Sequence, residues 1–280
     1  MEVERKIRIT EPFVSFLEED RDDIHYHAVY REVSKLPCFS GEVLKHAIDY
    51  DVFQEEDGYV RRFHDHRRDD RPYAAARLFP EKRQIRIEYL PEGRCFLNES
   101  GNCFFHLMWE KVLSVEKRII LHASCIESRY GGILFSGASG IGKSTQSELW
   151  CRYENARLLN GDRPILWKRN GEWRAYGSPY AGSSGVYRNE SCPVSAIVML
   201  RQASYCGLRK LQTAEAFRSI FRGLTVNTWD RQFASTASEA AADLAVCVPV
   251  YELFCTPDQR AVELLRMELS KEGGRWNQRK

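Results

Sequence analysis

The chain has 280 residues, of which 43% are hydrophobic and 29% charged, and its formal net charge is +2. This composition is typical of a globular protein that buries its own core, and the length suits one large domain or two small ones. The near balance of charge gives no reason to expect a nucleic-acid partner. Because no apolar run approaches the roughly 20 residues that a helix needs to span a bilayer, we expect no membrane association.

The cysteines and the N-terminal residues indicate a compartment. Nine cysteines are scattered along the chain and none forms a Cys-x-x-Cys pair, so a disulfide framework is not expected. Residues 1–10 alternate charged and apolar side chains and lack the apolar segment of a signal peptide. Both features favour a cytoplasmic protein with reduced thiols.

Residues 1–102 are predicted to be a strand-rich region. Apolar side chains alternate there with charged ones, and this period of two is typical of half-buried antiparallel strands. Charged stretches such as 18–23 and 55–58 separate the segments. The alternating apolar positions are Ile7 and Ile9, then Ile24, Tyr26, Ala28 and Tyr30, then Ile85, Ile87 and Tyr89.

From residue 103 to residue 270 helical and strand-like segments alternate, and a polar tail is expected over 271–280. Helical spacing of apolar residues predicts helices, and short continuous apolar runs predict buried strands. Thr213 is expected to cap one helix, and Thr256 another that has Pro257 in its first position. The expected helices are 103–115, 144–151, 213–221, 238–246 and 257–269, and the expected strands are 119–126, 133–135, 196–200 and 250–254. The sequence therefore predicts a mixed α/β (α+β) fold.

A glycine-rich loop follows the predicted strand 133–135. Its sequence, Gly137-Ala138-Ser139-Gly140-Ile141-Gly142-Lys143-Ser144, matches the phosphate-loop (Walker A) pattern G-x-x-x-x-G-K-[ST] at every fixed position. Glycines allow the backbone to curl so that several N–H groups point at one anion, and the following helix directs its positive end toward that anion. Strand, loop and helix occur in the order that the pattern needs. The sequence therefore predicts that ATP binds to residues 137–144 and the adjoining Thr145.

Lys143 and Ser144 have separate expected roles. The lysine places a cation against the outer phosphates, and the serine hydroxyl ligates Mg²⁺. A carboxylate at the end of a neighbouring strand commonly completes such a magnesium site. Asp162 follows the apolar pair Leu158-Leu159, nineteen positions after Lys143, and is the predicted second ligand. The alternative is an ordinary turn, since Asn160-Gly161 is a strong turn signal.

Several segments together resemble one enzyme family. His122-Ala123-Ser124, the loop 132–145 and Asn160-Gly161-Asp162-Arg163 resemble the HPr kinase/phosphorylase group, which shares its phosphate loop with phosphoenolpyruvate carboxykinases. The segments 176–182 and 251–258 are similar to the same group, and the likeness extends to related kinases that phosphorylate a serine of lasso-peptide precursors. The resemblance covers about residues 107–269. It implies a P-loop domain of the HPr kinase C-terminal type over 103–270.

The chain departs from that family at one place. Members usually hold two adjacent aspartates, one for acid–base work and one for the metal, whereas this sequence has Gly161 before Asp162. Two alternatives stay open: Asp162 performs both tasks, or His122 assists it, since the matching family position lies near the phosphate loop. His122 is explained equally well as a strand histidine bound to backbone, and Arg163 as a phosphate ligand or a surface charge. The missing aspartate also weakens the expectation of a reverse phosphorylase reaction.

The leading hypothesis is an ATP- and Mg²⁺-dependent kinase that phosphorylates a hydroxyl, with a serine of a peptide or small protein as the favoured acceptor. Lys143, Asp162 and His122 would be its catalytic residues, and residues 1–102 would recognise the acceptor. The alternatives are a kinase for a small-metabolite hydroxyl and a nucleotide-regulated module without catalysis. The resemblance also implies a homo-oligomer, because HPr kinases are typically hexamers.

Overall fold

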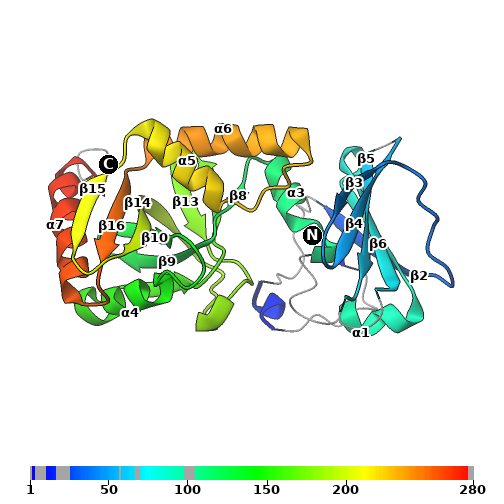
Figure 1. Ribbon diagram of the computed structural model, residues 1–280, viewed down its shortest axis with the longest axis horizontal. Helices are drawn as coiled ribbons and strands as arrows, with labels where there is room; N and C mark the ends of the chain where they lie inside the picture. Colours follow the sequence, from blue (N-terminus) through cyan, green and yellow to red (C-terminus); the bar gives the residue numbers. More distant parts are fainter. Residues whose placement is uncertain are drawn as a thin grey trace. The chain divides into compact units, whose positions relative to one another are not determined.

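A computed structural model describes residues 2–3, 11–16, 26–56, 58–66, 70–97 and 105–276. The chain forms two compact units, Met1–Val112 and Leu113–Lys280 (Figure 1). Each unit contains one sheet with both parallel and antiparallel pairs, so the prediction of a mixed α/β fold is confirmed. The predicted domain boundary between residues 102 and 103 lies within the first unit.

The first unit contains a seven-stranded sheet in the order β1-β2-β7-β6-β5-β4-β3. Strands β3 to β7 pair with one another in antiparallel fashion, as predicted. The prediction is wrong for β2, which runs parallel to β7. The chain forms β3 to β6 between these two strands, and β7 then lies beside β2 in the same direction. The predicted strand positions Ile7, Ile9 and Ile24 lie outside the described residues. The strands are β1 (Glu2–Val3), β2 (His27–Glu32), β3 (Val43–His46), β4 (Tyr50–Glu55), β5 (Gly58–His64), β6 (Pro72–Phe79) and β7 (Gln84–Tyr89).

One face of this sheet carries the core of the first unit. Phe63, Ile85 and Ile87 are fully buried there, and Met108 packs with them. Met108 has a φ of 47°, which interrupts the helix predicted over 103–115, so the regular helix begins only at Trp109. The short helical elements of this region are η1 (Phe13–Phe16), η2 (Pro80–Lys82), η3 (Pro91–Gly93), α1 (Arg94–Leu97) and α3 (Trp109–Val115).

A buried ion pair lies in the same core. Arg61, 1% exposed, donates from Nη2 to Glu110 Oε1 at 2.6 Å and from Nη1 to the carbonyl oxygen of Phe105 at 3.3 Å. Its guanidinium also lies over the Tyr50 ring, 4.7 Å from the centroid. A buried arginine of this kind needs its carboxylate, because an unpaired charge in a protein interior is costly.

The second unit contains a nine-stranded sheet with the path β11-β9-β10-β14-β13-β12-β8. From residue 194 onward β14 pairs in parallel with β10 and then also with β16, which in turn pairs with β15, and its first residues pair with β13. The strands are β8 (Ile119–Ile120), β9 (Ala123–Ser128), β10 (Gly131–Ser136), β11 (Arg157–Asn160), β12 (Ile165–Arg169), β13 (Glu172–Tyr176), β14 (Ser191–Gln202), β15 (Gly207–Lys210) and β16 (Val250–Cys255).

Helices cover both faces of the second sheet and make three layers (Figure 1). Helices α4 (Lys143–Glu154) and α7 (Gln259–Trp276) bury Leu149, Trp150 and Leu265 against one face. Helices α5 (Thr213–Gly223) and α6 (Arg231–Cys247) bury Ile220 and Leu244 against the other. The short helix η4 (Gly182–Ser184) follows β13. Among the described residues, no helix is long and apolar enough to cross a bilayer.

Most predicted elements of the second unit are present, with corrections at their ends. The cap of α5 is Gln212 and not Thr213, because Gln212 and Glu215 form a reciprocal capping box. The last helix begins at Gln259, since the Asp258 carboxylate accepts the Arg260 N–H at 3.0 Å and so closes a turn before it. This helix runs to Trp276, into the stretch predicted as a polar tail.

The predicted strand 119–126 is divided into β8 and β9 at residues 121–122. The His122 N–H donates to the carbonyl oxygen of Gly223 at 2.9 Å instead of to a neighbouring strand of the ladder. The interruption places His122 immediately before the first residue of β9.

Candidate functional site

The glycine-rich loop joins the end of β10 to the start of α4, in the predicted order. Gly137, Gly140 and Gly142 have φ values of 148°, 74° and 111°, a region that residues with a Cβ rarely adopt. Ala138 and Ser139 are exposed at the outer side of the curl, and Ile141 packs inward. The backbone path of the loop therefore requires the three glycines. This path brings the backbone amides of the loop next to the first turn of α4.

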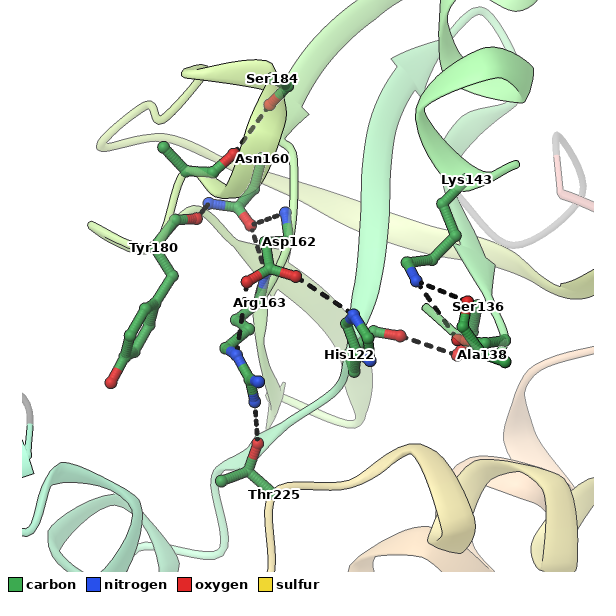
Figure 2. A network of polar contacts seen from close by, with 12 residues as sticks. His122, Ser136, Ala138, Lys143, Asn160, Asp162, Arg163, Tyr180, Ser184 and Thr225 are labelled. Carbon is green, nitrogen blue, oxygen red and sulfur yellow. Dashed lines mark hydrogen bonds and ion pairs between the residues drawn. The ribbon is translucent and has the colours of Figure 1, made fainter. Parts of the chain in front are cut away.

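Lys143 lies across this curl. Its side chain is largely buried, and Nζ donates to the carbonyl oxygens of Gly137 at 3.3 Å and Ala138 at 3.2 Å (Figure 2). Burial lowers the pKa of Lys143 from its ordinary value, and the nearby Asp162 carboxylate opposes that effect. Ser144 and Thr145 occupy the first turn of the helix that Lys143 opens.

Asp162 and His122 come together beside the loop. The Oδ1 atom of Asp162 lies 3.2 Å from His122 Nε2, and its Oδ2 atom lies 3.4 Å from Arg163 Nε (Figure 2). The two residues reach each other because Asp162 follows β11 and His122 precedes β9, and these strands are neighbours. The predicted pair of His122 and Asp162 is thus a direct contact.

The electrostatic surroundings of His122 favour its neutral form. Burial is the main cause that lowers the pKa of His122 below its ordinary value of 6.5, and the Lys143 ammonium lowers it further. The Asp162 carboxylate acts in the opposite direction, and Arg163 adds to the lowering. A neutral imidazole can hydrogen bond to a carboxylate with one nitrogen and accept a proton with the other.

Gly161 stands where the resembling family usually has the first of its two adjacent aspartates, and the structure leaves no room for a side chain there. A Cβ at this position would lie 1.8 Å from Ser184 Oγ and 2.6 Å from the carbonyl oxygen of Ala181. The segment 181–184, which includes η4, occupies that space. In the described part of the chain, the end of β11 therefore carries the carboxylate of Asp162 without a second one at position 161.

A cavity of about 610 Å³ opens beside the loop. Gly137, Ala138 and His122 line one part of it. Among the described residues, three arginines also line the cavity and no aspartate or glutamate does; the arginines are Arg163, Arg201 and Arg222. This lining suits an anionic ligand.

Sequence reasoning gave no role to Arg201 or Arg222. They come from the end of β14 and from α5, which lie far apart in the sequence, so only the tertiary fold reveals their common position. Arg201 is paired with Glu252, Nε to Oε1 at 2.9 Å, and Arg222 is exposed.

Ser144 and Asp162 are the predicted magnesium ligands. In the described part of the chain the two share no direct hydrogen bond, and no group of three or more His, Cys, Asp or Glu side chains gathers as a metal cluster. One hydroxyl and one carboxylate nevertheless fit a Mg²⁺ ion that takes its remaining ligands from nucleotide phosphates and water. The donor set is thus compatible with a nucleotide-borne magnesium and does not resemble a self-sufficient protein metal site.

Comparisons with known proteins add a distant likeness. No protein-family model matches the chain, and no curated protein matches it. Among solved structures, the chain is similar to the Hpr(Ser) kinase/phosphatase from Coxiella burnetii with a TM-score of 0.35 and 13% identity, over 56% of this chain and 96% of that one.

Proposed function

We propose that this protein is an ATP- and Mg²⁺-dependent kinase that transfers the γ-phosphate to a hydroxyl, with a serine of a peptide or small protein as its acceptor. The observation that carries the proposal is the group of Lys143, Asp162 and His122 at one glycine-rich turn between a buried strand and a helix. A turn with backbone amides, a helix N-terminus and a lysine at one point is suited to the anionic end of a nucleoside triphosphate.

Each residue of the group has a defined task. The amides of residues 137–142 and the Lys143 ammonium would hold the β- and γ-phosphates. The Ser144 hydroxyl and the Asp162 carboxylate would hold Mg²⁺, which neutralises charge on the phosphates when it is bound. Phosphoryl transfer depends chiefly on positioning and charge neutralisation, so one carboxylate at this position would be enough for catalysis.

His122 suits the task of receiving or orienting the acceptor proton. Its lowered pKa keeps the imidazole neutral near pH 7, and its contact with Asp162 fixes the ring beside the loop. His122 also lines the cavity, so an acceptor hydroxyl that enters there would meet this side chain. The choice of a peptide serine as acceptor is supported by the resemblance to kinases of lasso-peptide precursors.

The test uses γ-labelled ATP with peptides encoded beside the gene of this chain, and with free serine as a competing acceptor. We expect label on a peptide serine for the wild-type protein, none for Lys143→Ala, and retained ATP binding but at least about 10²-fold slower transfer for Asp162→Asn. Label on free serine alone would show that the acceptor is a small molecule and not a peptide. ATP binding without transfer to any hydroxyl would overturn the kinase proposal in favour of a nucleotide-regulated module.

A further inference from the structure

Asn160 is the last residue of β11 and is completely buried, with 0% of its side chain surface exposed. Its side-chain Nδ2 donates to the carbonyl oxygens of Ser178 at 2.9 Å and Tyr180 at 3.0 Å. Its Oδ1 accepts the backbone N–H of Asp162 at 3.1 Å and that of Arg163 at 2.8 Å (Figure 2). An asparagine amide has two N–H donors and two lone pairs, and all four are used here.

The two bonds to Oδ1 hold the backbone that carries the site carboxylate. They hold the backbone of Asp162 and Arg163 from one side, while the N–H of Ala123 donates to the carbonyl oxygen of Asp162 at 2.9 Å from the other. The Asp162 carboxylate is then directed between His122 and the Arg163 guanidinium. The position of the Asp162 carboxylate between these two groups therefore depends on the turn that Asn160 closes.

The two bonds from Nδ2 hold the segment that covers this turn. Ser178 is tied to it a second time, since its Oγ donates to the carbonyl oxygen of Arg163 at 2.7 Å. The chain continues to Ala181 and Ser184, whose atoms occupy the space above Gly161. The Asn160 side-chain amide thus connects two parts of the site. One is the segment 178–184, which leaves no room for a carboxylate at position 161, and the other is the turn that carries Asp162.

The far end of Arg163 is also fixed. Its Nη1 donates to Thr225 Oγ1 at 2.8 Å, and its guanidinium lies over the Tyr180 ring, 5.8 Å from the centroid. Both Thr225 and Arg163 line the cavity. A shift of the turn at Asn160 would therefore move a carboxylate and a guanidinium together, at the place where the phosphoryl group is transferred under the proposed function.

We propose that Asn160 is a positioning residue of the phosphoryl transfer, which acts on the reaction through the orientation of Asp162. The inference rests on the proposed kinase function and deepens it. Because position 161 has no room for a side chain, no adjacent carboxylate can take over when that of Asp162 turns away. A misplacement of about 1 Å in such a site can slow the reaction about 10²-fold, with little effect on groups that bind the nucleotide elsewhere.

The test compares Asn160→Ala with Asn189→Ala, the same substitution at an exposed position that no functional contact involves. We expect Asn160→Ala to lower kcat about 10²-fold while the Kd for ATP changes less than about threefold, because the loop 137–142 and Lys143 are untouched. Asn189→Ala should leave kcat and Kd at wild-type values. Circular dichroism and thermal unfolding give the folded fraction of each variant, and kcat is expressed per folded protein.

A double-mutant cycle separates positioning from a general structural role. If Asn160 acts through Asp162, Asn160→Ala should have almost no further effect on transfer in an Asp162→Asn background. Equal fold losses in both backgrounds, or a Kd for ATP that rises as much as kcat falls, would overturn the inference while leaving the kinase proposal intact. A wild-type protein that binds ATP and transfers no phosphate would overturn the proposed function, and the role of Asn160 in transfer with it.

Discussion

Gly161→Ala is a small substitution for which the structure predicts a large effect. The added Cβ would lie 1.8 Å from Ser184 Oγ, 2.9 Å from Ser184 Cβ and 2.6 Å from the carbonyl oxygen of Ala181. Gly161 is not among the glycines with positive φ, so alanine fits the backbone conformation and the effect is purely steric. Two of the obstructing atoms cannot rotate away, because one is a backbone oxygen and the other a Cβ.

The cost follows from what has to move. Forcing an extra carbon into a packed site costs about 1–3 kcal/mol, and losing the hydrogen bond from Ser184 Oγ to the Ala181 carbonyl adds about 1 kcal/mol. For a unit of this size, each kcal/mol lowers the Tm by about 2–4 °C, so a decrease on the order of 10 °C is expected. Because the displaced segment is bound to the Asp162 turn through Asn160, phosphate transfer should fall as well.

The assay is thermal unfolding of the full chain together with transfer kinetics per folded protein. Ser184→Gly alone should cost about 1–3 kcal/mol, because it loses the hydrogen bond from Ser184 Oγ to the Ala181 carbonyl and the one from the Val186 N–H to Ser184 Oγ. Adding Ser184→Gly to Gly161→Ala removes two of the three close contacts, so the double variant should be more stable than the sum of the single effects predicts. A Gly161→Ala protein with wild-type Tm and transfer rate would refute the reasoning about the space above Asp162.

Three further predictions concern other parts of the chain. Since the pKa of His122 is lowered from 6.5, kcat/KM should stay level near neutral pH and fall only when the pH drops through the lowered pKa of His122. The variant His122→Gln should lack this decrease at acidic pH in its pH–rate profile. Gly132→Ala should lower the free energy of unfolding by about 1–3 kcal/mol in urea, because its Cβ would lie 2.7 Å from the buried Cys192 Sγ; an unchanged urea midpoint would contradict this. Arg61→Ala should destabilise the first unit by about 3–5 kcal/mol, since it removes the guanidinium from the buried Glu110 carboxylate, whereas replacing both residues by apolar side chains should cost less.

The sequence predicted the parts of the site that lie close together along the chain. The glycine positions of the loop, the start of α4 near Ser144 and the strand that precedes Asp162 are local patterns, and the corresponding elements are present. The contact between Asp162 and His122 was only an alternative at that level. It depends on the pairing of β9 with β11 and on the break between β8 and β9, which no local pattern indicates.

The remaining features depend on residues that are distant in sequence. The sequence indicated a turn at Asn160. It did not indicate that the Asn160 side-chain amide is buried and donates to the carbonyl groups of residues 178 and 180, which are distant in sequence. Arg201 and Arg222 have no motif of their own and meet only at the cavity. The parallel direction of β2 likewise depends on the whole course of the sheet, since alternation of apolar residues is the same in parallel and antiparallel half-buried strands.

The shared use of β14 has a consequence for how the second unit opens. Strand β10, which ends at the loop, and strand β16 both hydrogen bond to the same stretch of β14, and β13 is joined to its first residues. Loss of either neighbour would leave one edge of the buried strand β14 without hydrogen-bond partners, so partial unfolding that removes one half of the sheet is unfavourable. Amide protons near Ile197 should therefore exchange with deuterium only through complete unfolding. The loop amides over 137–142 should exchange by local fluctuation. The difference between the two exchange rates measures how independently the loop moves from the sheet that carries it.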